Sequence, residues 1–393
     1  MLKSLANLPA TVWLLGLVSL FNDAASELVY PLVPLYLASV LMAGPKALGL
    51  IEGIAEATGS LLKLFSGVLA DRFGSTKGWV VGGYGLTAAC RPLLALVTSW
   101  PAVLALRFAD RVGKGLRASP RDALLAASIT PDQRGLAFGL HRAMDNAGAV
   151  IGPLLGAALL ASGMAIRDIL LWTLVPGVMT VAFALGVREP ERKPAGNAAF
   201  SWTLQGFPPV FKRYLLVLAL FTLGNSSNMF LLLRAREVGV PEAQVPVLWA
   251  LTAAVAMLGS TPLAALSDRV GRLRLILGGW VVYGAFYLLL SLIDSSTALL
   301  WPLFALYGLF LAATEGAERA LVADLAPASL LGTAYGWFNV TTGVMLLPAS
   351  ILFGWLWQSA GPQTAFSFGA ACAVLAALLL KGWVASGSPP RRT

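Results

Sequence analysis

Apolar residues fill long continuous runs of this chain, and polar or Pro- and Gly-containing stretches interrupt these runs at short intervals. A helix that crosses a bilayer needs about 20 consecutive, mostly apolar residues, because the hydrocarbon core is about 30 Å thick. By this criterion the pattern predicts twelve membrane-spanning helices, near 10–40, 47–70, 78–98, 101–126, 135–162, 168–187, 213–234, 244–266, 275–294, 299–324, 332–358 and 364–384. The chain is therefore expected to be an all-α integral membrane protein.

The longest polar interruption, residues 188–212, is rich in proline and charge and is typical of a surface linker. It divides the predicted helices into two groups of six. We therefore expect an N-terminal six-helix bundle at 1–187, a cytoplasmic linker at 188–212 and a C-terminal six-helix bundle at 213–393.

The two halves also resemble each other in sequence. The segment GVLADRFGSTK, which begins at Gly67, matches AALSDRVGRLR, which begins at Ala264, at an offset of 197 residues. A second pair of similar segments begins at Arg121 and Arg319. Internal repeats in a membrane chain are typical of transporters whose binding site lies between the repeats. The repeat predicts two pseudo-symmetric bundles.

Composition excludes several classes of protein. Hydrophobic residues make up 58% of the chain and charged residues 12%, whereas soluble domains are about 25% charged. Two cysteines and one histidine provide neither a disulfide framework nor a multi-histidine metal or haem site, so no metal or cofactor is expected. Because membrane proteins carry basic cytoplasmic loops, the net charge of +9 does not indicate nucleic acid as a partner.

The basic residues of the predicted loops are strongly biased to one side of the membrane. Fifteen of them fall on the side of the N-terminus, and only Lys46, Arg167 and Arg236 fall on the other. Positive loops remain in the cytoplasm. We therefore expect a multi-pass protein of the cytoplasmic (inner) membrane with both termini in the cytoplasm.

Several short motifs resemble those of the major facilitator superfamily. Asp71, Arg72 and Gly74, between the second and third predicted helices, are similar to its Asp-Arg-x-Gly loop motif, and Asp268 and Arg269 form a weaker copy. The resemblance implies that these residues lock the cytoplasmic side when the carrier opens outward. The segment RVGKG, from position 111, is similar to the family's pattern in helix 4, although lysine replaces the usual glutamine.

The fifth predicted helix resembles the antiporter motif of the same family. Gly148, Gly152, Pro153 and Gly156 form a glycine series that ends in Gly-Pro-x-x-Gly. This resemblance implies export, although such glycines also permit close helix packing whatever the function. The family fold further implies that helices 1, 4 and 5 line a central cavity, with helices 7, 10 and 11 opposite.

The fourth predicted helix carries a stripe of cations. At 100° per residue, its basic residues fall within about 120° of one another: Arg107, Arg111, Lys114, Arg117 and Arg121. Exposure to lipid would cost several kcal/mol per charge, so the stripe must face protein or a watery cavity. Ten cations and nine acids fall within the predicted spans, which favours paired networks.

The charged and amide residues of the spans are the candidate functional residues. The candidates for substrate binding or proton coupling are Asp23, Glu27, Glu52, Glu56, Arg111, Lys114, Arg142, Asp145, Asn228 and Glu315. The candidates for gating are Asp71, Arg72, Gly74, Arg117, Arg121, Asp122, Asp268, Arg269, Glu318 and Arg319. Structural ion pairing is the competing interpretation for several of them. Burial favours a neutral carboxyl and a nearby cation favours a charged one, so a carboxyl in this set can carry a transported proton.

These patterns favour a secondary transporter that works by alternating access, with proton-coupled efflux as the leading hypothesis. Proton-coupled uptake of a small polar or anionic solute is the alternative, and a non-transporting membrane sensor is an alternative of another class. A membrane enzyme is disfavoured by the scarcity of histidine and cysteine. The expected partners are a small-molecule substrate, protons and the lipid bilayer, and the chain is expected to be a monomer.

Overall fold

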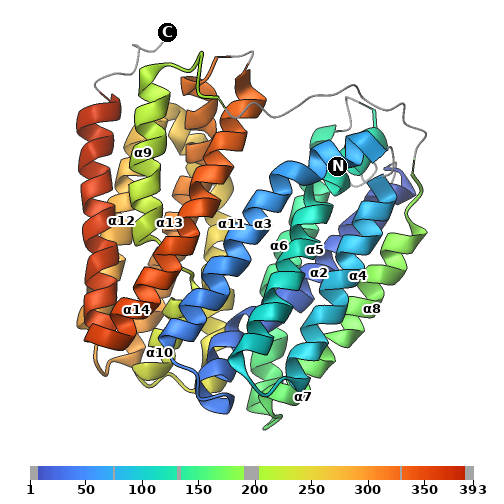
Figure 1. Ribbon diagram of the computed structural model, residues 1–393, viewed down its shortest axis with the longest axis horizontal. Helices are drawn as coiled ribbons and strands as arrows, with labels where there is room; N and C mark the ends of the chain where they lie inside the picture. Colours follow the sequence, from blue (N-terminus) through green and yellow to red (C-terminus); the bar gives the residue numbers. More distant parts are fainter. Residues whose placement is uncertain (1–7, 74–75, 131–133, 190–202, 328–329, 386–393) are drawn as a thin grey trace. The chain divides into compact units, whose positions relative to one another are not determined.

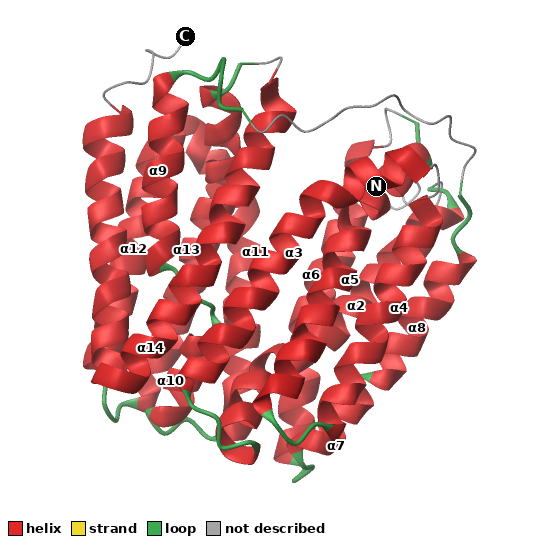
Figure 2. Ribbon diagram, viewed as in Figure 1, coloured by secondary structure: helices red, strands yellow, loops and turns green. Residues whose placement is uncertain are grey.

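The computed structural model describes residues 8–73, 76–130, 134–189, 203–327 and 330–385. Throughout these ranges the regular structure is helical and no strand occurs (Figure 2). The first half contains α2 (Ala10–Leu35), α3 (Pro45–Phe73), α4 (Thr76–Leu93), α5 (Trp100–Ala127), α6 (Arg134–Ala161), α7 (Ile166–Trp172) and α8 (Leu174–Gly186) (Figure 1). The second half contains α9 (Pro209–Gly224), α10 (Met229–Glu237), α11 (Val245–Val270), α12 (Arg272–Leu292), α13 (Thr297–Leu325) and α14 (Leu331–Leu379).

Three interruptions reconcile these elements with the twelve predicted spans. Helices α7 and α8 meet at Thr173, and α9 and α10 are separated by the non-helical residues 225–228. Helix α14 is two helices joined at Gly361, which has a φ of 86° and is followed by Pro362. Only glycine adopts such a φ readily, so this residue allows the chain to turn back. If α7–α8 and α9–α10 are each counted as one interrupted helix and α14 as two helices, the described ranges contain twelve long helices.

Eight helical segments of the described chain are long and apolar enough to cross a membrane, and one of them contains both parts of α14. The other three long helices, α3, α4 and α5, are less apolar than these eight segments because they contain more charged residues and glycines. Six of their charged side chains are buried inside the protein, away from lipid: Glu52, Arg91, Arg107, Asp110, Arg111 and Arg117. The expected all-α membrane fold of twelve helices is confirmed.

The chain forms two compact units. Unit 1 comprises Met1–Met42, Ile54–Ala199 and Pro241–Ala250, and unit 2 comprises Ala43–Gly53, Phe200–Val240 and Leu251–Thr393. In unit 1, α2 packs against α6 and α8, and α4 packs against α5 and α8. In unit 2, α9 packs against α14, and α12 packs against α13 and α14. Each unit also includes the first turns of one helix from the other half of the sequence, α11 in unit 1 and α3 in unit 2.

Glycines bring α6 into direct backbone contact with α2. A Cβ added at Gly148 would lie 2.5 Å from the carbonyl oxygen of Leu20, and one added at Gly152 would lie 2.8 Å from the amide nitrogen of Leu28. Neither distance leaves room for a side chain. At Gly156 the nearest atom would be 3.7 Å away, which is an ordinary contact. The α2–α6 interface is therefore closest around residues 148–152.

Aromatic side chains fill the interior of unit 2. The rings of Phe221 and Trp280 stack with centroids 4.3 Å apart, and those of Tyr283 and Tyr287 stack at 4.2 Å. The Tyr283 hydroxyl donates a 3.0 Å hydrogen bond to the carbonyl oxygen of Gly224, the last residue of α9. Such stacked pairs add to the stability that burial alone provides. This tyrosine also satisfies a carbonyl that the break after α9 frees.

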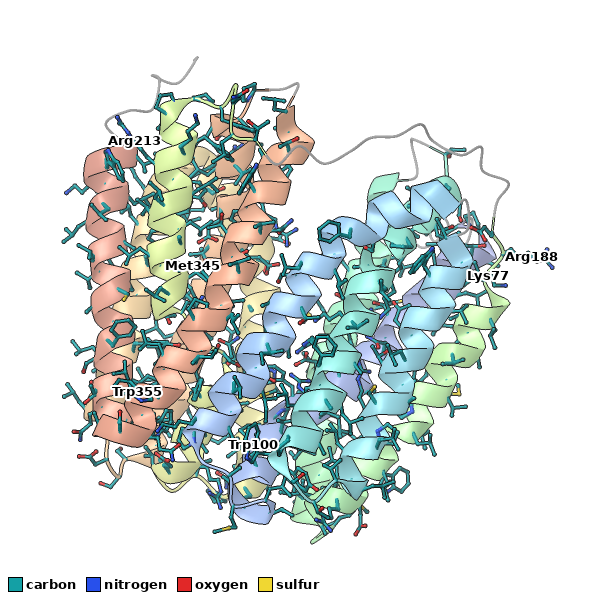
Figure 3. All side chains as sticks on the ribbon, viewed as in Figure 1. Lys77, Trp100, Arg188, Arg213, Met345 and Trp355 are labelled. Atoms are coloured by element: carbon teal, nitrogen blue, oxygen red, sulfur yellow. The ribbon has the colours of Figure 1, made fainter. Side chains whose placement is uncertain are left out.

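Polar contacts at one end of unit 1 connect the start of α4 to the end of α8. Lys77 and Arg188 lie at this end, and Trp100 lies at the opposite end (Figure 3). Glu189 accepts hydrogen bonds from the amide of Thr76 at 2.5 Å and from its hydroxyl at 2.6 Å. Partial burial acts to raise the pKa of Glu189, but these hydrogen bonds outweigh it and lower that pKa below its ordinary value.

Candidate functional site

A chain of buried ion pairs connects α3, α4 and α5 within unit 1. The Nε of Arg91, in α4, lies 3.1 Å from Oδ1 of Asp110, in α5. Arg111 follows Asp110 and places Nη2 2.7 Å from Oε1 of Glu56, in α3. Arg91, Asp110 and Arg111 are all buried, so these charges depend on one another for compensation. Arg91 also donates a 2.9 Å hydrogen bond to the carbonyl oxygen of Asn22, in α2.

Two carboxyl groups meet where α2 contacts α6. Asp23, in α2, and Asp145, in α6, are electrostatic neighbours there. The Ser19 hydroxyl donates to Oδ1 of Asp145 at 2.5 Å, and Asn22 Nδ2 donates to Oδ1 of Asp23 at 2.8 Å. Two neighbouring carboxylates repel each other when both are ionised, so a proton on one of them is favoured. This arrangement can hold and release a proton.

A second carboxyl of α2 is tied to the first turns of α11, which belong to the same unit. Trp249 Nε1 donates a 2.8 Å hydrogen bond to Oε2 of Glu27. The Trp249 ring also stacks on Tyr30, one turn further along α2, with centroids 5.1 Å apart. Glu27 therefore connects the charged interior of unit 1 to the start of α11.

The cationic stripe of α5 divides into residues with different surroundings. Arg107, Arg111 and Arg117 are buried, and the guanidinium of Arg117 lies 4.1 Å from the ring centroid of Tyr84. Lys114 is exposed and has Arg111, Glu56 and Asp23 as electrostatic neighbours. Lys114 is therefore a cation of this stripe that solvent or a solute can reach.

The remaining unit 1 candidates form partly exposed pairs. Arg121 lies 2.8 Å from the carboxylate of its neighbour Asp122. Arg142 lies 3.8 Å from Oδ2 of Asp145, and its side chain is 62% exposed. Exposed pairs of this kind contribute between about 0 and 1 kcal/mol to stability. The Arg142 contact nevertheless places a cation beside the Asp23–Asp145 pair.

Unit 2 holds a separate set of the predicted residues. Glu52 is buried and accepts a 3.4 Å hydrogen bond from the Ser227 hydroxyl, at the break between α9 and α10. In the same break, Oδ1 of Asn228 accepts a 2.6 Å hydrogen bond from the Tyr307 hydroxyl. Further along α13, Glu318 accepts a 3.0 Å hydrogen bond from Trp280 Nε1.

The predicted gate residues are described only in part. The gate candidate Arg319 lies 3.9 Å from Glu315, a candidate for proton coupling, on α13, and Arg269 is exposed at the end of α11. Gly74 and the side chains of Asp71, Arg72 and Asp268 lie outside what the structure describes. The role inferred for them from the loop motif remains a prediction.

Three residues of the unit 1 cluster were not identified from the sequence: Ser19, Arg91 and Trp249. Arg91 offered a signal, because it is a cation inside an otherwise apolar predicted span and requires a partner. Ser19 and Trp249 offered none, since serine and tryptophan are common in membrane helices. In the described residues, no group of three or more His, Cys, Asp and Glu side chains could hold a metal ion.

Comparison with known proteins identifies relatives along the whole chain. The Major Facilitator Superfamily profile matches residues 15–233 and 214–393. An uncharacterised MFS-type transporter of Methanocaldococcus jannaschii is 34% identical over 380 residues, which cover 95% of this chain and 94% of that protein. The multidrug resistance protein MdtH of Salmonella newport is 27% identical over 346 residues, with coverage of 84% and 82%.

Solved structures show the same fold at low sequence identity. An auto-inhibited POT family peptide transporter superimposes with a TM-score of 0.82 at 15% identity and covers 98% of each chain. The D323A mutant of the nucleoside transporter NupG superimposes with a TM-score of 0.81 at 15% identity, with 94% of this chain and 99% of that chain covered. At such identities the likeness concerns the fold alone.

Proposed function

Because the chain belongs to the Major Facilitator Superfamily and is a membrane transporter of that type, we propose that it exports a small solute in exchange for protons across the cytoplasmic membrane. In this proposal the bundles 1–187 and 213–393 alternate access to a central site, and the linker 188–212 and both termini are cytoplasmic. The chain works as a monomer. The glycine series of α6 and the multidrug resistance relative support export.

The neighbouring carboxyl groups of Asp23 and Asp145, at the close contact of α2 with α6, are the observation that carries the proposal. The pair binds one proton in this conformation. When the cavity opens to the other side, water and the neighbouring cations Arg142 and Lys114 favour the charged form, and the proton leaves. Proton binding and release on opposite sides of the membrane would then drive the exchange.

One observation favours the alternative direction, uptake by symport. Lys114 is exposed beside buried ion pairs and has the charge to bind an anionic group of a solute. A proton on the carboxyl pair would then cross the membrane in the same direction as the anionic solute, rather than in the opposite direction. Both directions use the same residues, and the direction of proton flux relative to the solute distinguishes them.

Infrared difference spectroscopy tests the shared proton without a known substrate. Purified wild-type protein at neutral pH should show a carbonyl band of a protonated carboxyl, and this band should disappear in both Asp23→Asn and Asp145→Asn. Asp168→Asn is the matched control, because Asp168 is an exposed aspartate in the first turn of α7. Persistence of the band in both Asp23→Asn and Asp145→Asn would remove the basis for the pair as the proton carrier.

Transport in proteoliposomes tests the direction. Solutes that raise the melting temperature of the purified protein are loaded into vesicles, and an inward proton gradient is imposed. Exchange predicts that the loaded solute leaves and the vesicle interior acidifies, whereas symport predicts accumulation of external solute with the same acidification. Solute flux that is indifferent to the proton gradient would exclude both.

A further inference from the structure

A groove opens on the surface of unit 2 between α11, α12 and α13. Its volume is about 330 Å³, and its lining is apolar except at one end, where Arg274 lies in the first turn of α12. Val270, the last residue of α11, and Leu309 of α13 form parts of the two walls and are 42% and 46% exposed. In a membrane-spanning helix bundle, such exposed apolar walls lie against lipid.

A glycine creates the depth of this groove. A Cβ added at Gly278 would meet no atom within 4 Å, so the missing side chain leaves open space. The adjacent Gly279 contacts Thr314 so closely that α12 and α13 have no room for a side chain between them there. The helices therefore meet at the floor of the groove and leave its upper part unfilled.

The groove has the length and shape of part of an acyl chain. It follows α12 from Arg274 to Val282, a span of eight helical steps, which corresponds to about 12 Å along the helix axis. A narrow apolar channel of this length, open sideways to the bilayer, accepts a flexible hydrocarbon chain. Among the described side chains that line it, a soluble polar ligand would find only Arg274 as a polar partner.

The charge at the end of the groove specifies the head group. Arg274 is exposed, whereas its neighbour Arg272 is bonded to Asp324 and donates a 2.7 Å hydrogen bond to the carbonyl oxygen of Ala320. The distribution of basic loops places the start of α12 on the cytoplasmic side, where membranes present anionic lipids. A basic residue at the cytoplasmic end of a groove between helices suits a lipid phosphate.

We propose that this groove is a binding site for an anionic phospholipid, with its phosphate on Arg274 and one acyl chain in the space beside Gly278. The site lies within unit 2 and is independent of the proton and solute chemistry proposed above. The lipid fills a gap between three helices that no side chain of the groove fills.

Native mass spectrometry of the purified, delipidated protein tests this site. Phosphatidylglycerol or phosphatidylcholine is titrated into wild type, Arg274→Gln, Arg274→Lys and Gly278→Leu. Gly278→Leu fills the groove, and its side chain has space on the existing backbone, so the fold should persist. The matched controls are Arg188→Gln, an exposed arginine in unit 1, and Gly82→Leu, where an added Cβ likewise meets nothing within 4 Å.

The proposal predicts that wild type binds phosphatidylglycerol more tightly than phosphatidylcholine. Arg274→Gln should weaken binding of phosphatidylglycerol about fivefold, Arg274→Lys should restore most of it, and Gly278→Leu should weaken binding of both lipids. The controls should match wild type. Equal binding of the two lipids by wild type, or wild-type affinity for phosphatidylglycerol in either Arg274→Gln or Gly278→Leu, would overturn the proposal.

Discussion

At the scale of single residues, the charges inside unit 1 depend on their partners to different degrees. Asp110 bridges Arg91 and Arg111 in the buried interior, whereas Asp122 pairs with Arg121 at the surface, with its side chain 51% exposed. Removing one member of a buried pair leaves a charge that neither water nor protein compensates. Replacing aspartate by asparagine should therefore lower the free energy of unfolding more at Asp110 than at Asp122.

Asp110→Asn should lower the free energy of unfolding by about 3 kcal/mol, because Arg91 and Arg111 remain buried without their shared carboxylate. Asp122→Asn should change it by less than about 1 kcal/mol. Chemical unfolding of both variants in the same detergent measures the difference. Equal stabilities would show that the ion pairs of α5 do not hold unit 1 together.

Lys114→Gln removes an accessible cation and introduces the residue that the family pattern has at this position. If Lys114 binds an anionic group, apparent affinity for the solute should fall while the pH profile of transport is unchanged. If it acts on the Asp23–Asp145 pair, the pair should keep its proton to higher pH, and the profile should move upward. Rates, affinities and pH profiles all matching wild type would show that this lysine is structural only.

At the scale of elements, the close contact of α2 with α6 provides a matched pair of substitutions. Gly152→Ala places a methyl group against the α2 backbone and should cost about 1–3 kcal/mol, because two helices must separate. Gly156→Ala has ordinary room and should be neutral or slightly stabilising, since alanine favours helix. Thermal unfolding in detergent measures both. A stable Gly152→Ala protein would mean that the interface is looser than described.

The junction of α8 with α4 gives a pH-dependent prediction. The pKa of Glu189 in the folded protein lies below its ordinary value of 4.5, so its stabilising hydrogen bonds are fully present above pH 4.5 and are lost as the pH falls through the folded pKa. Glu189→Gln should therefore cost roughly 0.5–1 kcal/mol at neutral pH. This difference from wild type should shrink in acid, and a difference independent of pH would exclude these hydrogen bonds as the source of the stability.

The sequence was sufficient for the elements because apolar runs of membrane length rarely form anything except a spanning helix. Even α5, which is more charged than a typical membrane span, was placed by the apolar residues on both sides of its charges. The partners of the buried charges could not be predicted in the same way. Arg111 was expected to need an acid, but periodicity along one helix cannot indicate that Glu56 of another helix supplies it. The contact of Trp249 with Glu27 joins residues 222 positions apart, and no local pattern encodes it.

At the scale of the whole molecule, the distribution of basic residues predicts the orientation in the membrane. Ala195→Cys places a reactive thiol in the linker, while the native Cys90 and Cys372 are buried. A membrane-impermeant maleimide should label this variant in inverted membrane vesicles and leave it unlabelled in intact cells, because positive segments stay inside. Labelling in intact cells would contradict the cytoplasmic placement of the linker.

The glycine contacts between α2 and α6 also constrain how a proton can be exchanged. A Cβ added at Gly148 would lie 3.1 Å from the Cβ of Asp23, so the two acids sit at the same seam where the helix backbones touch. Asp23 and Asp145 cannot move apart unless the α2–α6 interface opens. The two helices must therefore travel as one piece during transport. In the exchange proposed above, the proton would bind and leave because the solvent that reaches this fixed pair of acids changes between the two sides of the membrane.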